Sequence, residues 1–306
     1  IKNFLCFHFI ILLIECINYL KENKKQIEKK MPELPEVQTV VNGIKDKLTG
    51  KKIINFKKFT TKLRYPIDTK INQKIKNLHV LNIKRVAKYI VINLTDNYTL
   101  IIHLGMSGRI ILNESSAKKE SKHNHFIICF TENIFLKYFD PRKFGLIHLV
   151  KTDEFHNLKF VKNLGIEPLS KKFNSNVLKL ICNKKRSNIK SIIMNQKYIV
   201  GVGNIYASEA LFISKINPLT EGCRLTFLEI ELLVKAIKFV LRKSIKLGGS
   251  SINDYALVSG NLGNYQNNVR VYGRDGLKCI NKSCNSFIIR IVISNRSTFM
   301  CPKCQK

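Results

Sequence analysis

The stretch Met31-Pro32-Glu33-Leu34-Pro35-Glu36-Val37-Gln38 decides how the rest of this sequence is interpreted. At a free N-terminus, the secondary amine of Pro32 can attack an electrophilic carbon and form an iminium ion, while Glu33 beside it moves protons. A free α-amino group has a pKa of about 7.7–8.0, so a useful fraction is unprotonated near neutrality. The stretch therefore predicts amine-type nucleophilic catalysis, on the condition that Pro32 is not held in a peptide bond to Met31.

Whether Pro32 is free depends on residues 1–31, which come before it in the sequence. The run Phe4–Leu20 is apolar, but it is interrupted by polar residues and is marginal for a membrane helix, which needs about 20 apolar residues. The sequence also begins with Ile1 rather than methionine. We expect residues 1–31 to be an over-extended start or a removed leader, with Met31 the true initiator and its loss freeing Pro32. The alternative is a membrane-anchored form that retains the leader.

Composition restricts the class of protein and the kind of partner. The chain has 306 residues, which suffice for a sizeable core and two domains, and 53 Lys and Arg against 21 Asp and Glu give a formal net charge of +32. This excess suits a polyanionic partner, nucleic acid first, although Lys, Ile and Asn are abundant throughout, as AT-rich coding would also produce. Nine cysteines in a chain of this length indicate a reduced, cytoplasmic setting rather than a secreted disulfide scaffold.

Two kinds of segment follow one another along the chain. From Pro35 to Leu48 apolar residues recur at helical spacing, and short β-rich segments then run to Val150, as in a β-sandwich or barrel. After about Val161 the pattern is helical, and Gly248–Gln266, rich in Gly, Ser and Asn, indicates a flexible loop. The expected strands are Ile53–Phe59, Val80–Val86, Tyr89–Leu94, Thr99–His103, Arg109–Leu112, Phe126–Phe130, Ile134–Tyr138 and Leu146–Val150, and the expected helices are Val177–Cys182, Ile189–Met194, Asn204–Phe212 and Phe227–Leu247.

Four cysteines cluster at the C-terminus. Cys301 and Cys304 are separated by two residues, which lets both thiolates reach one ion. Cys279 and Cys284 are separated by four residues, at the loose end of usual zinc spacing. The residues between the pairs suffice for two short strands, around Phe287–Ile293 and Ser297–Met300. The pattern predicts a zinc hairpin with four cysteine ligands and one Zn²⁺ per chain; the alternative is two unrelated cysteine pairs.

Five further features suit DNA binding, although each also has an ordinary structural interpretation. Glycines in Gly201–Ala207 would let the backbone approach a phosphate, or simply form a tight turn. Asp140–Gly145 places two cations beside an aromatic that can enter a base stack, or is a solvated turn. Met106, in HLGMSG, is more commonly a core methionine. Lys88 begins an apolar strand, where most lysines reach water, and Arg296 is expected at the hairpin tip.

Together these segments resemble the formamidopyrimidine-DNA glycosylases, a family of bifunctional base-excision enzymes. The resemblance runs from Met31 to Lys306 and rests, in this order, on PELPEV, RxAKY, HLGMSG, DPRKFG, LGIEPL, VGVGNIYASE, VYGR and RSTFxCPxCQK. Several independent motifs in one order make coincidence a poor explanation, and the ordinary interpretations of single motifs lose most of their force.

The resemblance implies an α+β fold in which a damaged base is flipped out of the duplex. An N-terminal helix and β-sandwich, residues 32–161, would lie across a DNA-binding cleft from a helix–two-turn–helix domain, residues 162–268. A zinc-finger hairpin, residues 269–306, would end the chain. The protein would act as a monomer in the cytoplasm, at the nucleoid. Its partner would be double-stranded DNA that contains oxidised purines or abasic sites, with no obligate protein or membrane partner.

By match of motif, four residues would carry the reaction. The amine of Pro32 would attack C1′ of the damaged nucleotide and Glu33 would protonate the sugar as its ring opens, so that the base leaves and an enzyme–DNA iminium remains. Lys88 matches the lysine assigned to proton transfer in β-elimination, and Arg296 the arginine assigned to δ-elimination. The implied product is a one-nucleoside gap with phosphates at both ends.

Other residues match positions that contact DNA without reading its sequence. Those expected to fill the void left by the flipped base are Met106, Arg142 and Phe144, and Arg142 would also face the orphaned partner base. Those expected to contact the backbone are His123, Arg186, Lys190 and Asn204. The zinc ligands would be Cys279, Cys284, Cys301 and Cys304.

Two other functions stay open. The endonuclease VIII-like glycosylases share the fold and mechanism but prefer oxidised pyrimidines; PELPEV rather than PEGPE, together with DPRKFG, favours purines. Two departures from the family pattern are Asn195, which replaces a usual aspartate, and Gly263-Asn264-Tyr265, which replaces a usual PGYF. The second region adjoins the loop that covers the flipped purine in the family, so it bears on lesion preference. The second alternative is a non-catalytic protein that binds lesion DNA, with the leader retained and Pro32 blocked.

Overall fold

The computed structural model describes residues 31–113, 118, 121–250 and 263–306. Residues 31–306 form one compact unit. No helix in the described part of the chain is long and apolar enough to cross a membrane. The interpretations of residues 1–30 as a leader or a membrane anchor lie outside the described residues.

Helix α2 (Leu34–Leu48) begins immediately after the extended residue Glu33. The Glu36 side chain accepts a hydrogen bond from the Glu33 backbone N–H at 2.9 Å, which satisfies a donor at the helix start. Pro35 fits the first turn because its missing N–H would have no partner there. The apolar stripe of this helix is buried and packs against β2 (Val80–Val86), so the N-terminal segment is fixed to the sheet that follows.

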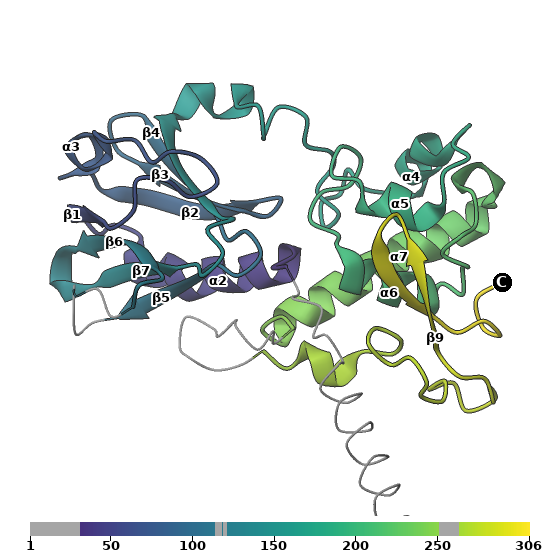
Figure 1. The fold of residues 1–306 in the computed structure, drawn as a ribbon. Helices are drawn as coiled ribbons and strands as arrows, with labels where there is room; N and C mark the ends of the chain where they lie inside the picture. Colours follow the sequence, from purple (N-terminus) through teal and green to yellow (C-terminus); the bar gives the residue numbers. More distant parts are fainter. Residues whose placement is uncertain (1–30, 114–117, 119–120, 251–262) are drawn as a thin grey trace, which may run out of the picture. The chain divides into compact units, whose positions relative to one another are not determined.

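Two four-stranded antiparallel sheets form a β-sandwich next to α2 (Figure 1). One sheet has the strand order β2-β3-β4-β8, in which β2, β3 and β4 are successive hairpin partners. The other has the order β1-β6-β7-β5. The remaining bounds are β1 Ile53–Lys58, β3 Tyr89–Leu94, β4 Tyr98–His103, β5 Arg109–Asn113, β6 Asn124–Phe130, β7 Phe135–Phe139 and β8 Leu146–Lys151.

The sandwich has its own apolar core. The Phe126 ring stacks between Phe56, at 5.4 Å between ring centroids, and Tyr138, at 4.8 Å. Val40 and Ile44 of α2 join the same cluster. Burying each such side chain contributes about 1.5–3 kcal/mol, so this core holds the loops at the sheet ends in place. Short helical segments connect the strands: α3 Ile71–Ile75 and the 3-10 segments η1 Thr131–Asn133 and η2 Thr152–Asn157.

The second half of the chain is helical and has a separate core. Three of the helices described below begin at side-chain caps: Asn174, Asn188 and Thr226 each accept a hydrogen bond from the first turn of the helix that follows. Leu34 from α2 lies in this second core, so the start of α2 is packed against the helical half. The helices are α4 Ser175–Cys182, α5 Ile189–Met194, α6 Asn204–Ile213 and α7 Phe227–Lys246, with 3-10 segments η3 Gly222–Arg224 and η4 Tyr265–Asn268.

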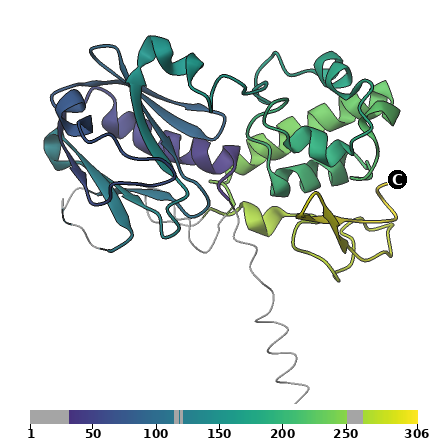
Figure 2. The ribbon, with the colours of Figure 1, turned by 45° about the horizontal axis from the view of Figure 1, so that its top comes forward.

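A two-stranded hairpin, β9 (Ile289–Ile293) and β10 (Arg296–Met300), lies at the C-terminal end of the chain. Helix α6 packs against α7 and also against β10, as both views of the ribbon show (Figures 1 and 2). The buried carboxylate of Glu209 on α6 accepts hydrogen bonds from three consecutive backbone N–H groups, those of Arg270, Val271 and Tyr272, at 2.9–3.0 Å. These contacts fix the segment that leads into the hairpin.

The predicted α+β architecture is confirmed, with every expected strand and helix within a few residues of its predicted bounds. Lys88 lies in the turn between β2 and β3 rather than in the strand itself. Most of the loop predicted at 248–266 lies outside the described residues, although Ser250 and Asn264 at its two ends form an isolated bridge. The boundaries 32–161, 162–268 and 269–306 stay predictions.

Candidate active site and metal centre

Glu33 lies where the start of α2 meets the VGVGNIY motif. The Leu34 N–H donates to the Gly201 carbonyl at 3.1 Å, and the Ile205 N–H donates to Glu33 Oε1 at 3.3 Å. A Cβ atom on Gly203 would lie only 2.2 Å from the Glu33 carboxyl carbon, so this close approach requires glycine. The glycine motif thus forms the binding site of the Glu33 carboxyl group.

The surroundings of Glu33 favour its protonated form. Burial raises its pKa from 4.5 to about 7; the positive charge of Lys88 opposes this shift and the negative charge of Glu36 adds to it. Glu33 is 5% exposed, and its Oε2 atom is buried without a hydrogen-bond partner among the described residues. A carboxyl group that titrates near neutrality has the property required of a proton donor in catalysis.

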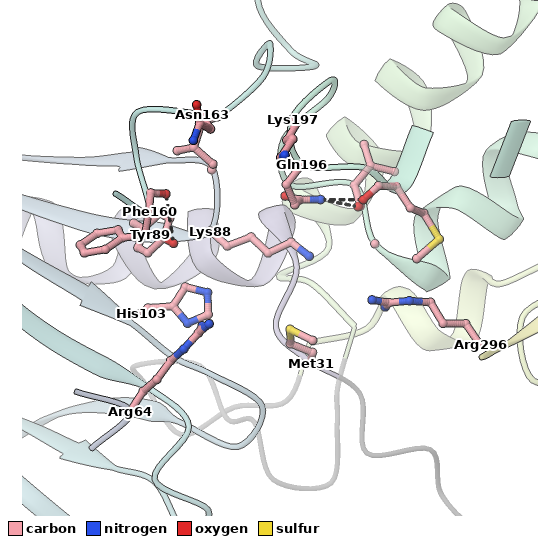
Figure 3. A pocket seen from close by; sticks show the side chains of 15 residues that line it. Met31, Arg64, Lys88, Tyr89, His103, Phe160, Asn163, Gln196, Lys197 and Arg296 are labelled. Carbon is pink, nitrogen blue, oxygen red and sulfur yellow. Dashed lines mark hydrogen bonds between the residues drawn. The ribbon is translucent and has the colours of Figure 1, made fainter. Parts of the chain in front are cut away.

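A cavity of about 360 Å³ opens beside the binding site of the Glu33 carboxyl group. Met31, whose carbonyl carbon is bonded to the Pro32 nitrogen, lines it, and Pro32 itself is buried. The side chains of Lys88 and Arg296 point into the space next to Met31 (Figure 3). Its walls come from the β-sandwich, the glycine motif and the C-terminal hairpin; lining residues include Arg64, Lys88, His103, Gln196, Gly203 and Arg296.

Lys88 is held in place by an ion pair between residues distant in sequence. Arg85 donates to both carboxylate oxygens of Glu167, at 3.0 and 2.8 Å. Glu167 also accepts the Ala87 N–H at 2.7 Å, and Ala87 has a φ of +53°. Loss of hydration lowers the pKa of Lys88, an effect that Glu33 opposes and the charge of Arg296 reinforces. The Glu167 contact therefore fixes the strained turn that presents this lysine to the cavity.

His103 and Arg64 line the cavity but were not among the predicted site residues. His103 Nδ1 accepts the Gly105 N–H at 2.9 Å, so the neutral ring carries its proton on Nε2. Burial, reinforced by the charges of Lys88 and Arg64, lowers the pKa of His103 to about 4. His103 is therefore a neutral donor near pH 7. It belongs to the HLGMSG motif, whereas nothing in the local sequence singles out Arg64.

Glu36 was also missed as a candidate, although it lies in the quoted N-terminal stretch. Besides the Glu33 N–H, it accepts the Ser250 N–H at 2.9 Å and the Tyr206 hydroxyl at 2.5 Å. Tyr206 in turn contacts the Ser244 hydroxyl at 2.6 Å. One buried carboxylate thus joins the residue next to Pro32 to α6 and to the residue that precedes the undescribed segment 251–262.

Arg296 opens strand β10, next to the turn Ser294-Asn295, as the hairpin prediction required. Lys190 and Asn204, predicted as DNA contacts, lie behind it. The Lys190 ammonium donates to Asn204 Oδ1 at 2.6 Å, to the Ser297 carbonyl at 3.2 Å and to Thr298 Oγ1 at 2.6 Å. Asn204 Nδ2 also donates to the Ser297 carbonyl at 2.9 Å. With Lys190 only 1% exposed, both residues tie the hairpin to α5 and α6 in this structure.

The motifs that carry Met106, Arg142 and Phe144 pack against each other. The Asp140 carboxylate accepts hydrogen bonds from the Ser107 hydroxyl at 2.6 Å and the Arg142 N–H at 3.2 Å, which joins the two loops. The Arg142 guanidinium lies 4.7 Å from the centroid of the Phe144 ring, and the Phe144 side chain is 46% exposed. Met106 is half-buried. The structure thus brings together a cation and an exposed aromatic on fixed loops.

Two other predicted DNA contacts have different surroundings. The carbonyl of His123 accepts the Asp140 N–H at 3.0 Å, and its ring meets the edge of Phe139 at 5.5 Å. His123 therefore lies beside the DPRKFG loop. Arg186 is exposed in the segment between α4 and α5 and does not line the cavity.

The four C-terminal cysteines converge as predicted: their sulfur atoms all lie within 4.8 Å of one another. The Cys279 and Cys304 sulfurs are 3.8 Å apart, and those of Cys284 and Cys301 are 3.6 Å apart. Four thiolates around one ion at Zn–S distances of about 2.3 Å would be separated by about 3.8 Å, so this donor set fits a tetrahedral metal site. A turn closed by the Cys284 N–H and the Asn281 carbonyl, at 2.8 Å, accommodates the four-residue spacing.

Comparison with known proteins agrees with this geometry. Residues 31–147 match the family model of the formamidopyrimidine-DNA glycosylase N-terminal domain, and residues 164–256 match that of the formamidopyrimidine-DNA glycosylase H2TH domain. The chain is 43% identical over 275 residues to a formamidopyrimidine-DNA glycosylase of Wolbachia pipientis, covering 90% of this chain and 100% of that protein. The corresponding protein of Rickettsia africae is 42% identical, with 90% and 99% covered.

Solved structures give the same result. The chain resembles a Lactococcus lactis Fpg mutant in complex with DNA containing Fapy-dG, with a TM-score of 0.82, 34% identity, and 90% of this chain and 100% of that chain covered. It also resembles the Lactococcus lactis Fpg in complex with DNA that contains an abasic site, with a TM-score of 0.81, 33% identity, and 90% and 99% covered.

Proposed function

We propose that this chain, which belongs to the formamidopyrimidine-DNA glycosylase family and acts on damaged bases in DNA, excises oxidised purines and then cleaves the strand at the resulting abasic site. The observation that carries the proposal is one cavity, lined by Met31, Lys88 and Arg296, beside a buried Glu33 whose pKa is about 7. The cavity thus gathers a candidate nucleophile, proton donor and cations.

In the proposed first step, the Pro32 nitrogen bonds to C1′ of the damaged nucleotide, the bond between C1′ and the base breaks, and the proton lost by the Pro32 nitrogen goes to the departing base. Glu33 delivers a proton to the sugar ring oxygen as the C1′–O4′ bond opens, which leaves an iminium between Pro32 and C1′. The raised pKa of Glu33 and its unpartnered Oε2 support the role of proton donor. The step requires Pro32 to be the first residue, because an amide nitrogen is not a nucleophile.

Strand cleavage follows from the iminium, which acidifies the C2′ hydrogens. Lys88, whose pKa is lowered, carries out the proton transfer as the 3′ phosphate leaves in β-elimination. Arg296 lies across the cavity and supplies positive charge to the departing 5′ phosphate in δ-elimination. Water then hydrolyses the iminium, which releases the unsaturated sugar fragment and restores the free Pro32 amine. The DNA product is a gap with phosphates at both ends.

DNA binding is assigned to the loops and to the cationic cavity. Arg142 and Phe144 would enter the space that the flipped base vacates, with Met106 beside them, because their loops are fixed through Asp140. His123 and Arg186 would contact phosphates. The protein would act as a monomer in the cytoplasm, on duplexes like those bound to its structural relatives.

Zn²⁺ is the metal that we assign to Cys279, Cys284, Cys301 and Cys304. It would supply folding energy to the hairpin rather than take part in bond breaking. Because β10 carries Arg296 at its start and leads to Cys301, the sulfur cluster and the cationic side of the cavity belong to one rigid segment.

The substrate assignment is tested with a chain that begins at Met31, given duplexes containing 8-oxoguanine opposite cytosine or thymine glycol opposite adenine. Faster release of 8-oxoguanine supports the purine assignment, and faster release of thymine glycol contradicts it. Oxidised pyrimidines are the second candidate, because one similar structure is a Lactococcus lactis Fpg complex with DNA containing an oxidised pyrimidine. A chain that binds both duplexes and releases neither base would be a lesion-binding protein.

A further inference from the structure

Helix α7 exposes a continuous stripe that faces away from the rest of the helical half. Its exposed positions are 228, 232, 235, 239, 242 and 246, whose alternating spacing of four and three places them on one side of the helix. The opposite side, with Ile230, Leu233, Ile237 and Leu241, is fully buried. The N-terminal part of the stripe is aliphatic, and the C-terminal part is cationic with one aromatic.

The cationic part of this stripe is hollowed into a groove of about 470 Å³. Among the described residues, no carboxylate lines it. Phe239 is 48% exposed, and the Arg270 guanidinium lies 5.8 Å from the centroid of its ring. The complete lining is Lys235, Lys238, Phe239, Arg242, Lys243 and Lys246.

Ordinary structural roles account for only part of this groove. Lys235 pairs with Glu231 at 2.6 Å, and Lys238 donates to the Ser170 carbonyl at 3.4 Å. Cations in the last turns of a helix also interact favourably with its carbonyl end. None of these contacts explains why a phenylalanine is left half in solvent between the cations, where burial would have stabilised the fold by about 1.5–3 kcal/mol.

We propose that this α7 groove binds an unpaired DNA strand, through its phosphates and by stacking of a base on Phe239. Proteins that bind single strands without reading sequence combine a positively charged groove with aromatic side chains. At a rise of about 1.5 Å per residue, the span from Lys235 to Lys246 is about 16 Å, which suits a short single-strand site of about four nucleotides.

This groove is distinct from the cavity that contains Arg296. All six residues that line the groove belong to α7, and none of them is among the residues that line the cavity. Helix α6 lies between α7 and strand β10, because it packs against both. The groove would therefore hold a second segment of DNA while a lesion occupies the cavity. The choice of DNA as the ligand rests on the proposed function, but strand binding is measured separately from base release, so the two can fail independently.

The test measures binding of a fluorescent oligothymidylate to the full chain as a function of salt, with the cavity saturated by a short duplex that contains a tetrahydrofuran abasic analogue. The groove variant is Arg242→Gln, Lys243→Gln and Lys246→Gln combined. The matched control removes the same charge from exposed positions of the β-sandwich half: Lys57→Gln, Lys76→Gln and Lys84→Gln.

The wild-type protein and the control should bind the second strand equally. In the groove variant, the plot of log affinity against log salt concentration should have a slope whose magnitude is smaller by about 2. Phe239→Leu should weaken binding about fivefold or more with the slope unchanged. Equal losses in groove and control variants, or no binding of a second strand, would overturn the proposal. Displacement of the strand by polyglutamate, with no effect of Phe239→Leu, would point to an acidic protein segment and overturn it too.

Discussion

The ammonium nitrogen of Lys190 lies 2.6 Å from the hydroxyl oxygen of Thr298, two residues beyond Arg296 on the same strand. Lys190 belongs to α5 and is 1% exposed. Its other acceptors are Asn204 Oδ1 and the Ser297 carbonyl, so a single buried cation joins α5, α6 and β10. Because Arg296 begins that strand, its place in the cavity depends on a residue that lies outside the cavity.

Lys190→Met should therefore disturb strand cleavage more than base release. The substitution removes the lysine donor from Asn204 Oδ1 and Thr298 Oγ1, at a cost of about 1–3 kcal/mol for each buried acceptor left unpaired; the Ser297 carbonyl keeps the Asn204 amide as a donor. We expect β-elimination products to accumulate at the expense of δ-elimination products, measured on gels of end-labelled duplex. Lys171→Met, at an exposed position, is the control and should behave as the wild-type protein. An unchanged product ratio in a folded Lys190→Met protein would show that this cation does not position Arg296.

Glu33→Gln should lower base release by about a hundredfold or more while leaving DNA binding intact, because the proton donor is lost. The stability of the Glu33→Gln protein should also depend on pH differently from that of the wild-type protein. The folded pKa of about 7 exceeds the ordinary value of 4.5, so the folded state holds this proton more tightly and stability falls as pH rises from 4.5 to 7.

Glutamine does not titrate in this range. The variant should therefore gain stability relative to the wild-type protein on going from pH 4.5 to pH 8, by up to about 3 kcal/mol. Urea denaturation of both proteins at the two pH values measures this difference. A variant whose relative stability is the same at both pH values would argue against a raised pKa for Glu33.

Glu167→Gln should impair proton transfer by Lys88 without touching the cavity directly. The Arg85 side chain is 8% exposed, and breaking its bidentate pair costs about 3 kcal/mol. Glutamine keeps one carbonyl oxygen but replaces the other with an amide nitrogen, so the Arg85 guanidinium loses one of its two acceptors and the support of the Ala87–Lys88 turn is weakened. We expect slower β-elimination from a preformed abasic site, with duplex affinity retained. Asp68→Asn, which breaks the exposed pair with Lys74, should have no measurable effect on the rate. Equal rates of β-elimination in the two variants would show that Glu167 does not position Lys88.

Metal removal should loosen the hairpin before it affects the β-sandwich. We expect elemental analysis to find one zinc per chain, and Cys301→Ser to reduce this content and the δ-elimination activity together. Cys223→Ser, at an exposed cysteine outside the cluster, should retain both. Full metal content in the Cys301→Ser protein would contradict the assigned ligand set.

Much of the fold could be predicted from the sequence, because strands and helices here have strong periodicity and clear turn residues. The hairpin β2–β3 and helix α5 match their predicted bounds residue for residue. The short helix α3 was missed, since five residues carry too little periodic signal. The cysteine cluster was predictable from spacing alone, although only the structure shows how the Asn281 turn accommodates the wider gap.

The contacts that support the site were less predictable. Arg85 and Glu167 are separated by 82 residues, and Lys190 and Thr298 by 108, so no local pattern relates them. Lysine is also common throughout this chain. The residue type alone therefore does not distinguish a buried lysine such as Lys190 from an exposed lysine that contacts a phosphate. Burial and the geometry of the acceptors distinguish the two.

In the proposed reaction, the Pro32 nitrogen becomes bonded to DNA. The most direct measurement adds borohydride to a mixture of the chain beginning at Met31 and a duplex containing 8-oxoguanine, and identifies the cross-linked peptide by mass spectrometry. We expect a reduced adduct on Pro32 at the N-terminus of that peptide, and none with Pro32→Gly. An adduct on Lys88 or another lysine, or base release without any trapped adduct, would contradict it.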